Sequence, residues 1–89
     1  MTKCLELWGL TKEEVSDAIA VMLRNKTAED LDGVSELGIQ SLRDLANRNW
    51  PSLHNDVAKL SGGIIVRSNV YANRQEIPRR VGYRVEIFS

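Results

Sequence analysis

The sequence predicts an α+β fold in which three to four short helices are followed by a C-terminal antiparallel β-hairpin. In the first two thirds of the chain, apolar residues recur at helical spacing. From Ile64 onward, β-branched residues and alternating polarity replace that pattern. Of the 89 residues 43% are hydrophobic, which suffices for one compact core, so we expect residues 1–89 to form a single domain.

The first helix is predicted from a capping box at residues 11–14. The Thr11 hydroxyl can accept from the first free amides of a helix, and Glu14 is placed to reach back. We expect this helix to end near Asn25, to bury Val15, Ala18, Ile19, Met22 and Leu23, and to expose Lys12, Glu13, Ser16, Asp17 and Arg24. The apolar-rich residues 3–10 before it fit either a strand of a sheet or an arm packed on the core.

Two more helix starts follow. Residues 27–30 and 41–44 repeat the Thr/Ser-x-x-acid pattern, and the helix from Ser41 is expected to end at Trp50 because Pro51 disfavours helical geometry in the preceding residue. Proline fits a first helical turn, so Pro51 is predicted to open a further helix that ends at the glycine pair 62–63. Its apolar stripe would be Leu53, Val57 and Leu60.

The hairpin is predicted from residues 64–71 and 81–88. In the second of these segments, Tyr83, Val85 and Ile87 alternate with Arg84, Glu86 and Phe88. The connection of residues 72–80 is too long for a tight turn, and it is predicted to be a basic loop.

Charge and composition narrow the function classes. Residues 1–40 carry 4 basic and 8 acidic side chains, whereas residues 41–89 carry 8 basic and 4 acidic ones, so an anionic partner is expected at the C-terminal half. One cysteine excludes an internal disulfide, and one histidine leaves no Cys/His set for zinc. No membrane-spanning stretch or signal pattern is present, so we expect a cytoplasmic protein. No catalytic constellation is visible, and we expect neither an enzyme nor a cofactor.

A family resemblance adds to this pattern. The segments SLRDLA (41–46), LHNDV (53–57), GIIV (63–66) and VGYRVEI (81–87) resemble small winged-helix transcription regulators, some of which are similar to antitoxins. The resemblance implies a winged helix-turn-helix in which the helix from Pro51 enters the major groove and residues 73–80 form the wing.

The function predicted from these features is a DNA-binding transcriptional regulator, an autorepressor or antitoxin-like protein, that binds double-stranded DNA as a homodimer. Base edges are read by hydrogen bonds, and phosphates are held by cations. The expected base-reading residues are Ser52, His54, Asn55 and Lys59, and the expected phosphate-binding cations are Arg48, Arg67, Arg74, Arg79 and Arg80. Asn73 is expected to contact DNA at the start of the wing.

Other interpretations remain open. A small phage or plasmid inhibitor or adaptor would dock on a protein partner through the hairpin edge or the acidic N-terminal half. Residues 31–60, through the segments LDGV (31–34) and LGIQSLRDLA (37–46), resemble helix-hairpin-helix sequences, whose backbone amides would also bind phosphate. The segment ELGIQSL (36–42) is similar to the motif of acyl carrier proteins, in which Ser41 would bear phosphopantetheine.

Overall fold

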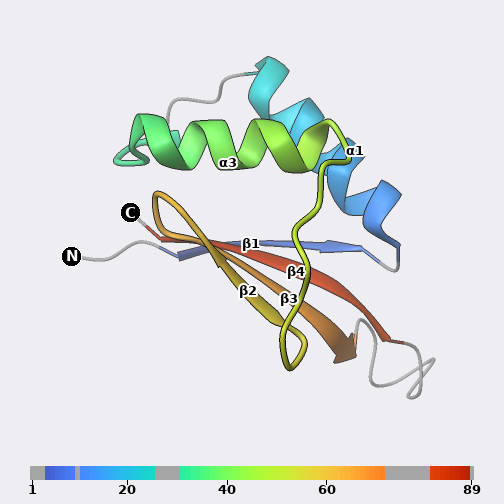
Figure 1. Ribbon diagram of the computed structural model, residues 1–89. Helices are drawn as coiled ribbons and strands as arrows, with labels where there is room; N and C mark the ends of the chain where they lie inside the picture. Colours follow the sequence, from blue (N-terminus) through green and yellow to red (C-terminus); the bar gives the residue numbers. More distant parts are fainter. Residues whose placement is uncertain (1–3, 10, 26–30, 72–80, 89) are drawn as a thin grey trace.

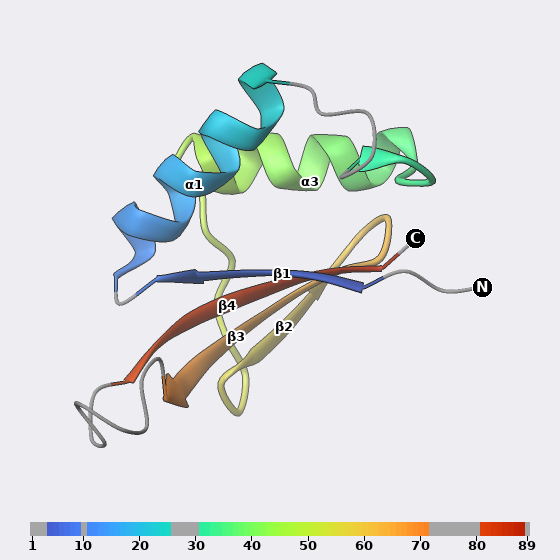
Figure 2. The same ribbon diagram turned by 180° about the vertical axis from the view of Figure 1, so that it is seen from behind.

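The described part of the protein has two layers, with helices α1 and α3 on one face of a four-stranded sheet. The structure, a computed structural model, describes residues 4–9, 11–25, 31–71 and 81–88. Its elements in chain order are β1 (Cys4–Gly9), α1 (Lys12–Asn25), α3 (Glu36–Ala46), β2 (Val57–Leu60), β3 (Ile64–Tyr71) and β4 (Val81–Phe88). All neighbouring strands are antiparallel, in the order β1-β4-β3-β2. The other face of the sheet is covered by no described element (Figure 1, Figure 2).

This architecture corrects the predicted fold. The α+β class and the paired strands β3 and β4 are confirmed. The expected order of three to four helices followed by a hairpin is wrong, because β1 precedes the helices and β2 follows them. No described residue between α3 and β2 is helical, so the arrangement is not a winged helix-turn-helix.

The helix predicted from Pro51 is absent because this region forms a tight turn and a strand. His54 and Val57 exchange both main-chain hydrogen bonds, at 3.0 and 3.1 Å, around Asn55 and Asp56. These two residues have φ angles of 53° and 62°. A two-residue type I′ turn needs positive φ at both central positions, and asparagine and aspartate tolerate it better than most residues. The turn therefore starts a hairpin, and the chain continues as β2.

The helix boundaries are set by two caps. Thr11 Oγ1 accepts from the Glu14 amide at 3.1 Å, which confirms the cap of α1, and this helix ends at Asn25 as predicted. The cap of α3 is Ser35, whose hydroxyl accepts from the Gly38 amide at 3.2 Å. The predicted start at Ser41 is therefore wrong, since Ser41 lies within α3. The start predicted at residues 27–30 lies outside the described residues.

The core lies between the two layers. Its buried apolar side chains come from α1, α3, β3 and β4, and they are Val15, Ile19, Met22, Leu42, Leu45, Ile64, Val66, Val85 and Ile87. Burial of each side chain of this size stabilises the fold by about 1.5–3 kcal/mol. The apolar faces predicted for the first helix and for the last strand are thus confirmed.

Ser16 is also in the core, although its position in the helical pattern predicted exposure. It is fully buried. Its hydroxyl donates to the Leu45 carbonyl at 2.7 Å and accepts from Trp50 Nε1 at 2.9 Å. Trp50 joins α1 to the sheet, since its ring also meets the Tyr83 ring edge-on, with the two ring centroids 5.6 Å apart.

Two glycines allow α3 to approach the turn between β2 and β3. A Cβ on Gly38 would lie 2.8 Å from the Gly62 carbonyl oxygen, closer than real contacts allow. Gly62 has a φ of 80°, a conformation that other residues rarely adopt. This contact brings α3 to the end of β2.

Candidate functional site

The uncovered face of the sheet is the first candidate site. Successive side chains of a strand point to opposite faces, so the neighbours of the buried Val85 and Ile87 point away from the helices. The strand register places two of them, Arg84 and Glu86, in rows of side chains that cross all four strands. We call them the Trp8 row (Trp8, Arg84, Arg67 and Val57) and the Glu6 row (Glu6, Glu86, Ile65 and Lys59).

One carboxylate links the two rows. Arg67 and Arg84 are direct cross-strand neighbours, an arrangement in which like charges repel. Glu86 Oε1 accepts from Arg67 Nε at 2.8 Å, and Glu86 Oε2 lies 3.4 Å from Arg84 Nη2. The Glu86 side chain is only 10% exposed, which strengthens both contacts. Two guanidinium groups thus share one negative charge, which leaves a net positive charge at the centre of the face.

Trp8 extends this cluster towards the edge strand β1. The Arg84 guanidinium carbon lies 5.4 Å from the centroid of the Trp8 ring, a cation–π distance. Trp8 is 41% exposed, so its ring is accessible from solvent. Arg84 Nε is buried without a hydrogen-bond partner among the described residues, so this guanidinium still has an unsatisfied donor. The face presents an exposed aromatic ring next to two arginines held in place.

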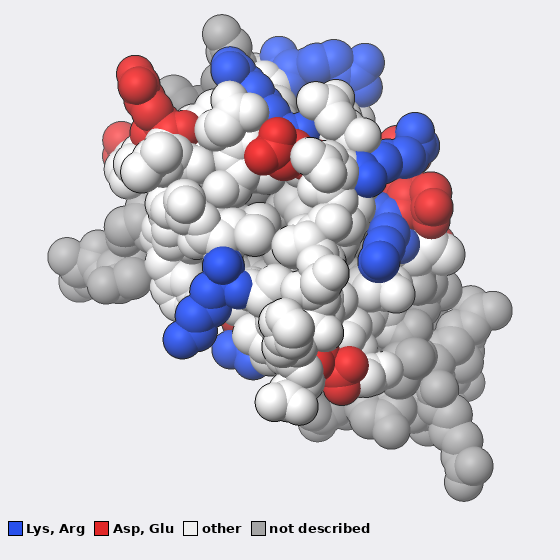
Figure 3. Space-filling model, viewed as in Figure 1, with Lys and Arg blue, Asp and Glu red and all other residues white. Residues whose placement is uncertain are grey.

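The charges differ between the two layers. Residues 11–25 and 31–50, which contain both helices, carry four basic and six acidic side chains. Figure 3 shows charges of both signs interspersed over the helix layer. The described strands carry three basic side chains (Lys59, Arg67 and Arg84) and two acidic ones (Glu6 and Glu86), and all five belong to the two rows of the uncovered face.

Of the predicted site residues that the structure describes, two lie together on the uncovered face. Lys59 and Arg67 lie on the uncovered face. Arg48 follows α3 on the helix layer, where its Nη2 lies 3.4 Å from Asp17 Oδ1. Ser52, His54 and Asn55 are exposed on the connection before β2 rather than on a recognition helix. The predictions for Asn73, Arg74, Arg79 and Arg80 fall outside the described residues.

Sequence reasoning missed the residues that complete the face. Arg84 and Glu86 were available from the pattern, because the alternation in residues 81–88 already placed them on one side, but Trp8 was not. What was missing was the partner strand β1, since residues 3–10 fitted both a strand and an arm. Trp8 and Arg84 come from opposite ends of the chain, and only the pairing of β1 with β4 makes them neighbours.

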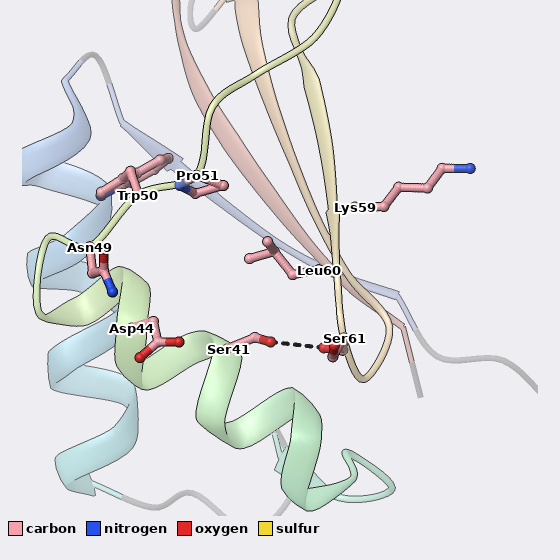
Figure 4. A pocket seen from close by; sticks show the side chains of 8 residues that line it. All are labelled: Ser41, Asp44, Asn49, Trp50, Pro51, Lys59, Leu60 and Ser61. Atoms are coloured by element: carbon pink, nitrogen blue, oxygen red, sulfur yellow. Dashed lines mark hydrogen bonds between the residues drawn. The ribbon is translucent and has the colours of Figure 1, made fainter.

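A hollow of about 390 Å³ between the two layers is the second candidate site. It is open to solvent between the C-terminal half of α3, the connection at residues 49–51 and the edge strand β2 (Figure 4). Its lining residues are Ser41, Asp44, Asn49, Trp50, Pro51, Lys59, Leu60 and Ser61. Ser41 is 8% exposed and donates its hydroxyl to the Ser61 carbonyl at 2.9 Å, so it is a packing residue of this wall.

Other chemistries find little support in the described part of the chain. No group of three or more His, Cys, Asp or Glu side chains is arranged there to bind a metal ion. None of the described helices combines the length and apolarity needed to cross a membrane.

The chain matches no protein-family model, and comparisons with curated proteins and with solved structures find no match.

Proposed function

We propose that this protein is a binding module for single-stranded nucleic acid, which it holds on the uncovered face of its sheet. The observation that carries the proposal is the Trp8 row with its shared carboxylate. An exposed aromatic ring beside fixed cations is the combination that binds single strands, because every base has a π-face for stacking and every nucleotide has a phosphate.

The three side chains have separate roles in this proposal. Trp8 stacks on one base. Arg67 donates to Glu86 through Nε, so its terminal Nη groups remain for a phosphate, and its side chain is 39% exposed. Arg84 lies between Trp8 and Glu86, and it keeps the aromatic ring and the cations at a fixed separation.

The shape of the face favours a single strand over a duplex. The major groove of B-DNA is about 12 Å wide and admits one helix or a two-stranded ribbon. Four strands spaced at about 4.8 Å present a face wider than that groove. The proposal therefore keeps the nucleic-acid partner expected from the sequence and replaces both the recognition helix and the double-stranded target.

The other interpretations have less support. Docking through the hairpin edge would need a free edge on β3 or β4, but both strands are flanked on each side within the sheet. A carrier function would need an accessible Ser41, and this side chain is buried against Ser61. The helix-hairpin-helix interpretation would need a second helix where β2 forms.

The test is fluorescence anisotropy of labelled single strands of about 12 nucleotides, within the usual site size of such surfaces, titrated with protein over a salt series. Phosphate contacts by two cations of the face, Arg67 and Lys59, predict a slope of log K against log salt of about −1.4. Trp8→Leu should weaken binding about tenfold or more, since stacking contributes about 1–3 kcal/mol per base. Arg67→Ala should weaken binding and reduce the slope by about 0.7.

The matched control is Arg43→Ala, which removes an exposed arginine from α3, on the opposite layer. Its affinity and salt slope should equal those of the wild type. If Arg43→Ala and Arg67→Ala lose affinity equally, the nucleic acid is attracted by charge anywhere on the surface, which would contradict the proposal. A duplex of the same sequence that binds as tightly as the single strand would contradict the single-strand preference.

A further inference from the structure

The hollow between α3 and β2 contains an interrupted sheet edge. The main-chain groups of a strand alternate between its two sides. The carbonyl of Asp56 accepts a hydrogen bond from the Ser68 amide of β3 at 2.9 Å. The next residue, Val57, makes both of its main-chain hydrogen bonds with His54, on the side of the chain away from β3. Within β2, odd-numbered residues therefore direct their main-chain groups away from β3, towards the edge.

Along that edge, Lys59 is the residue left without a partner. Val57 is paired with His54, and the Ser61 carbonyl accepts from the Ser41 hydroxyl. A continued ladder would pair Lys59 with Ser52, but no hydrogen bond joins them. The amide and the carbonyl of Lys59 consequently have no hydrogen-bond partner among the described residues. The connection separates from β2 at this point, and the hollow lies between them.

The walls of the hollow define what fits there. Trp50, Pro51 and Leu60 supply apolar surface, and Asp44 and Asn49 supply polar groups (Figure 4). Figure 4 also shows that the Lys59 side chain points away from the other lining residues, so its ammonium group does not neutralise Asp44. Asp44 uses Oδ1 for a long contact of 3.3 Å with Gln40 Nε2, which leaves its second oxygen for a cation.

We propose that this hollow binds an extended peptide segment of a partner protein, and that a basic side chain of the segment pairs with Asp44. One residue of the peptide exchanges hydrogen bonds with the main chain of Lys59, as an added strand does at a sheet edge. The side chain of the peptide residue directly opposite Lys59 points to the same face of the sheet as Lys59, away from the helices. The side chain of the next peptide residue therefore points to the other face, towards α3 and Asp44. A volume of about 390 Å³ lies at the small end of ligand sites and suits two or three residues.

The probe is acetyl-Arg-Thr-Arg-methylamide, which presents an arginine to Asp44 in either strand direction. It is titrated into isotopically labelled protein and followed by amide NMR spectra. The expected dissociation constant is about 1 mM, and the largest shifts should occur at the Lys59 and Ser61 amides and at the Trp50 indole. Methylation of the threonine nitrogen should abolish these shifts, because it removes the donor to the Lys59 carbonyl.

Asp44→Asn should weaken binding of this peptide about threefold, a modest effect because the ion pair with Asp44 is partly exposed. The affinity for an analogue with norleucine in place of arginine should stay the same. Asp32→Asn, at an exposed aspartate before α3, is the matched control and should change the affinity for neither peptide. Absence of shifts at the Lys59 amide up to about 10 mM peptide, or equal binding of the N-methylated peptide, would overturn the proposal. Nucleic-acid binding by Asp44→Asn should equal that of the wild type, which separates this site from the uncovered face.

Discussion

Arg67 and Arg84 lie directly opposite each other on β3 and β4, and both contact the single carboxylate of Glu86. Two cations in that position would repel each other across the strands. The Glu86 carboxylate offsets this repulsion because it contacts both guanidinium groups, and Arg84 in turn contacts the Trp8 ring. The same three charges therefore serve both the stability of the sheet and the proposed binding face.

Glu86→Gln is expected to lower the free energy of unfolding by about 1–2 kcal/mol, because it leaves the two arginines without their shared carboxylate. The value is below that of a fully buried pair because Arg67 and Arg84 are 39% and 24% exposed. Urea denaturation measures it. Glu6→Gln is the control: Glu6 faces Glu86 across the strands, so its neutralisation should leave stability unchanged or raise it by a few tenths of a kcal/mol. Equal losses in both variants would contradict the assigned role of Glu86.

Gly38→Ala should destabilise the protein by about 1–3 kcal/mol, because the added methyl group would press on the Gly62 carbonyl. The same change at an unhindered helical position usually stabilises by up to about 1 kcal/mol. The sign of the effect, read from thermal or urea unfolding, therefore tests the close approach of α3 to the turn. Gln40→Ala on the exposed side of α3 should change stability by less than about 0.5 kcal/mol.

The change in stability on substitution of Asn55 distinguishes the observed turn from a helix by its sign. Asn55→Gly should leave stability unchanged or raise it slightly, because glycine adopts positive φ readily. Asn55→Val should lower stability by about 1–2 kcal/mol, since a β-branched residue is strained there. In a helix, glycine would instead cost a few tenths of a kcal/mol relative to asparagine. A loss of stability in Asn55→Gly, measured by urea denaturation, would contradict the type I′ turn.

Ser16→Ala should lower the free energy of unfolding by about 1–2 kcal/mol. The change removes the acceptor of Trp50 Nε1 and one donor to the Leu45 carbonyl, and buried polar groups without partners are costly. Ser52→Ala, at an exposed serine, is the control and should have no measurable effect. If the two variants have equal stability in urea, the hydrogen-bonded link from α1 through Ser16 to Trp50 does not stabilise the fold.

The sequence by itself determined the elements whose information is local. Thr11 and the spacing of Val15, Ile19 and Met22 predicted α1, since a cap and a helical period lie within one segment. The alternation of residues 81–88 predicted β4 and which of its side chains are buried, because the period of a strand is read from one strand alone.

The tertiary structure decided what depends on neighbours distant in the sequence. Leu53, Val57 and Leu60 fit a helical stripe as well as a strand, and pairing with β3 selected the strand. Ser16 had the polarity of an exposed residue, but the approach of Leu45 and Trp50 gave it partners inside the core. The uncovered face joins Trp8 to Arg84 through the register of β1 and β4. Pairing across strands leaves no local pattern in a single sequence, and for that reason the binding face became visible only in the folded chain.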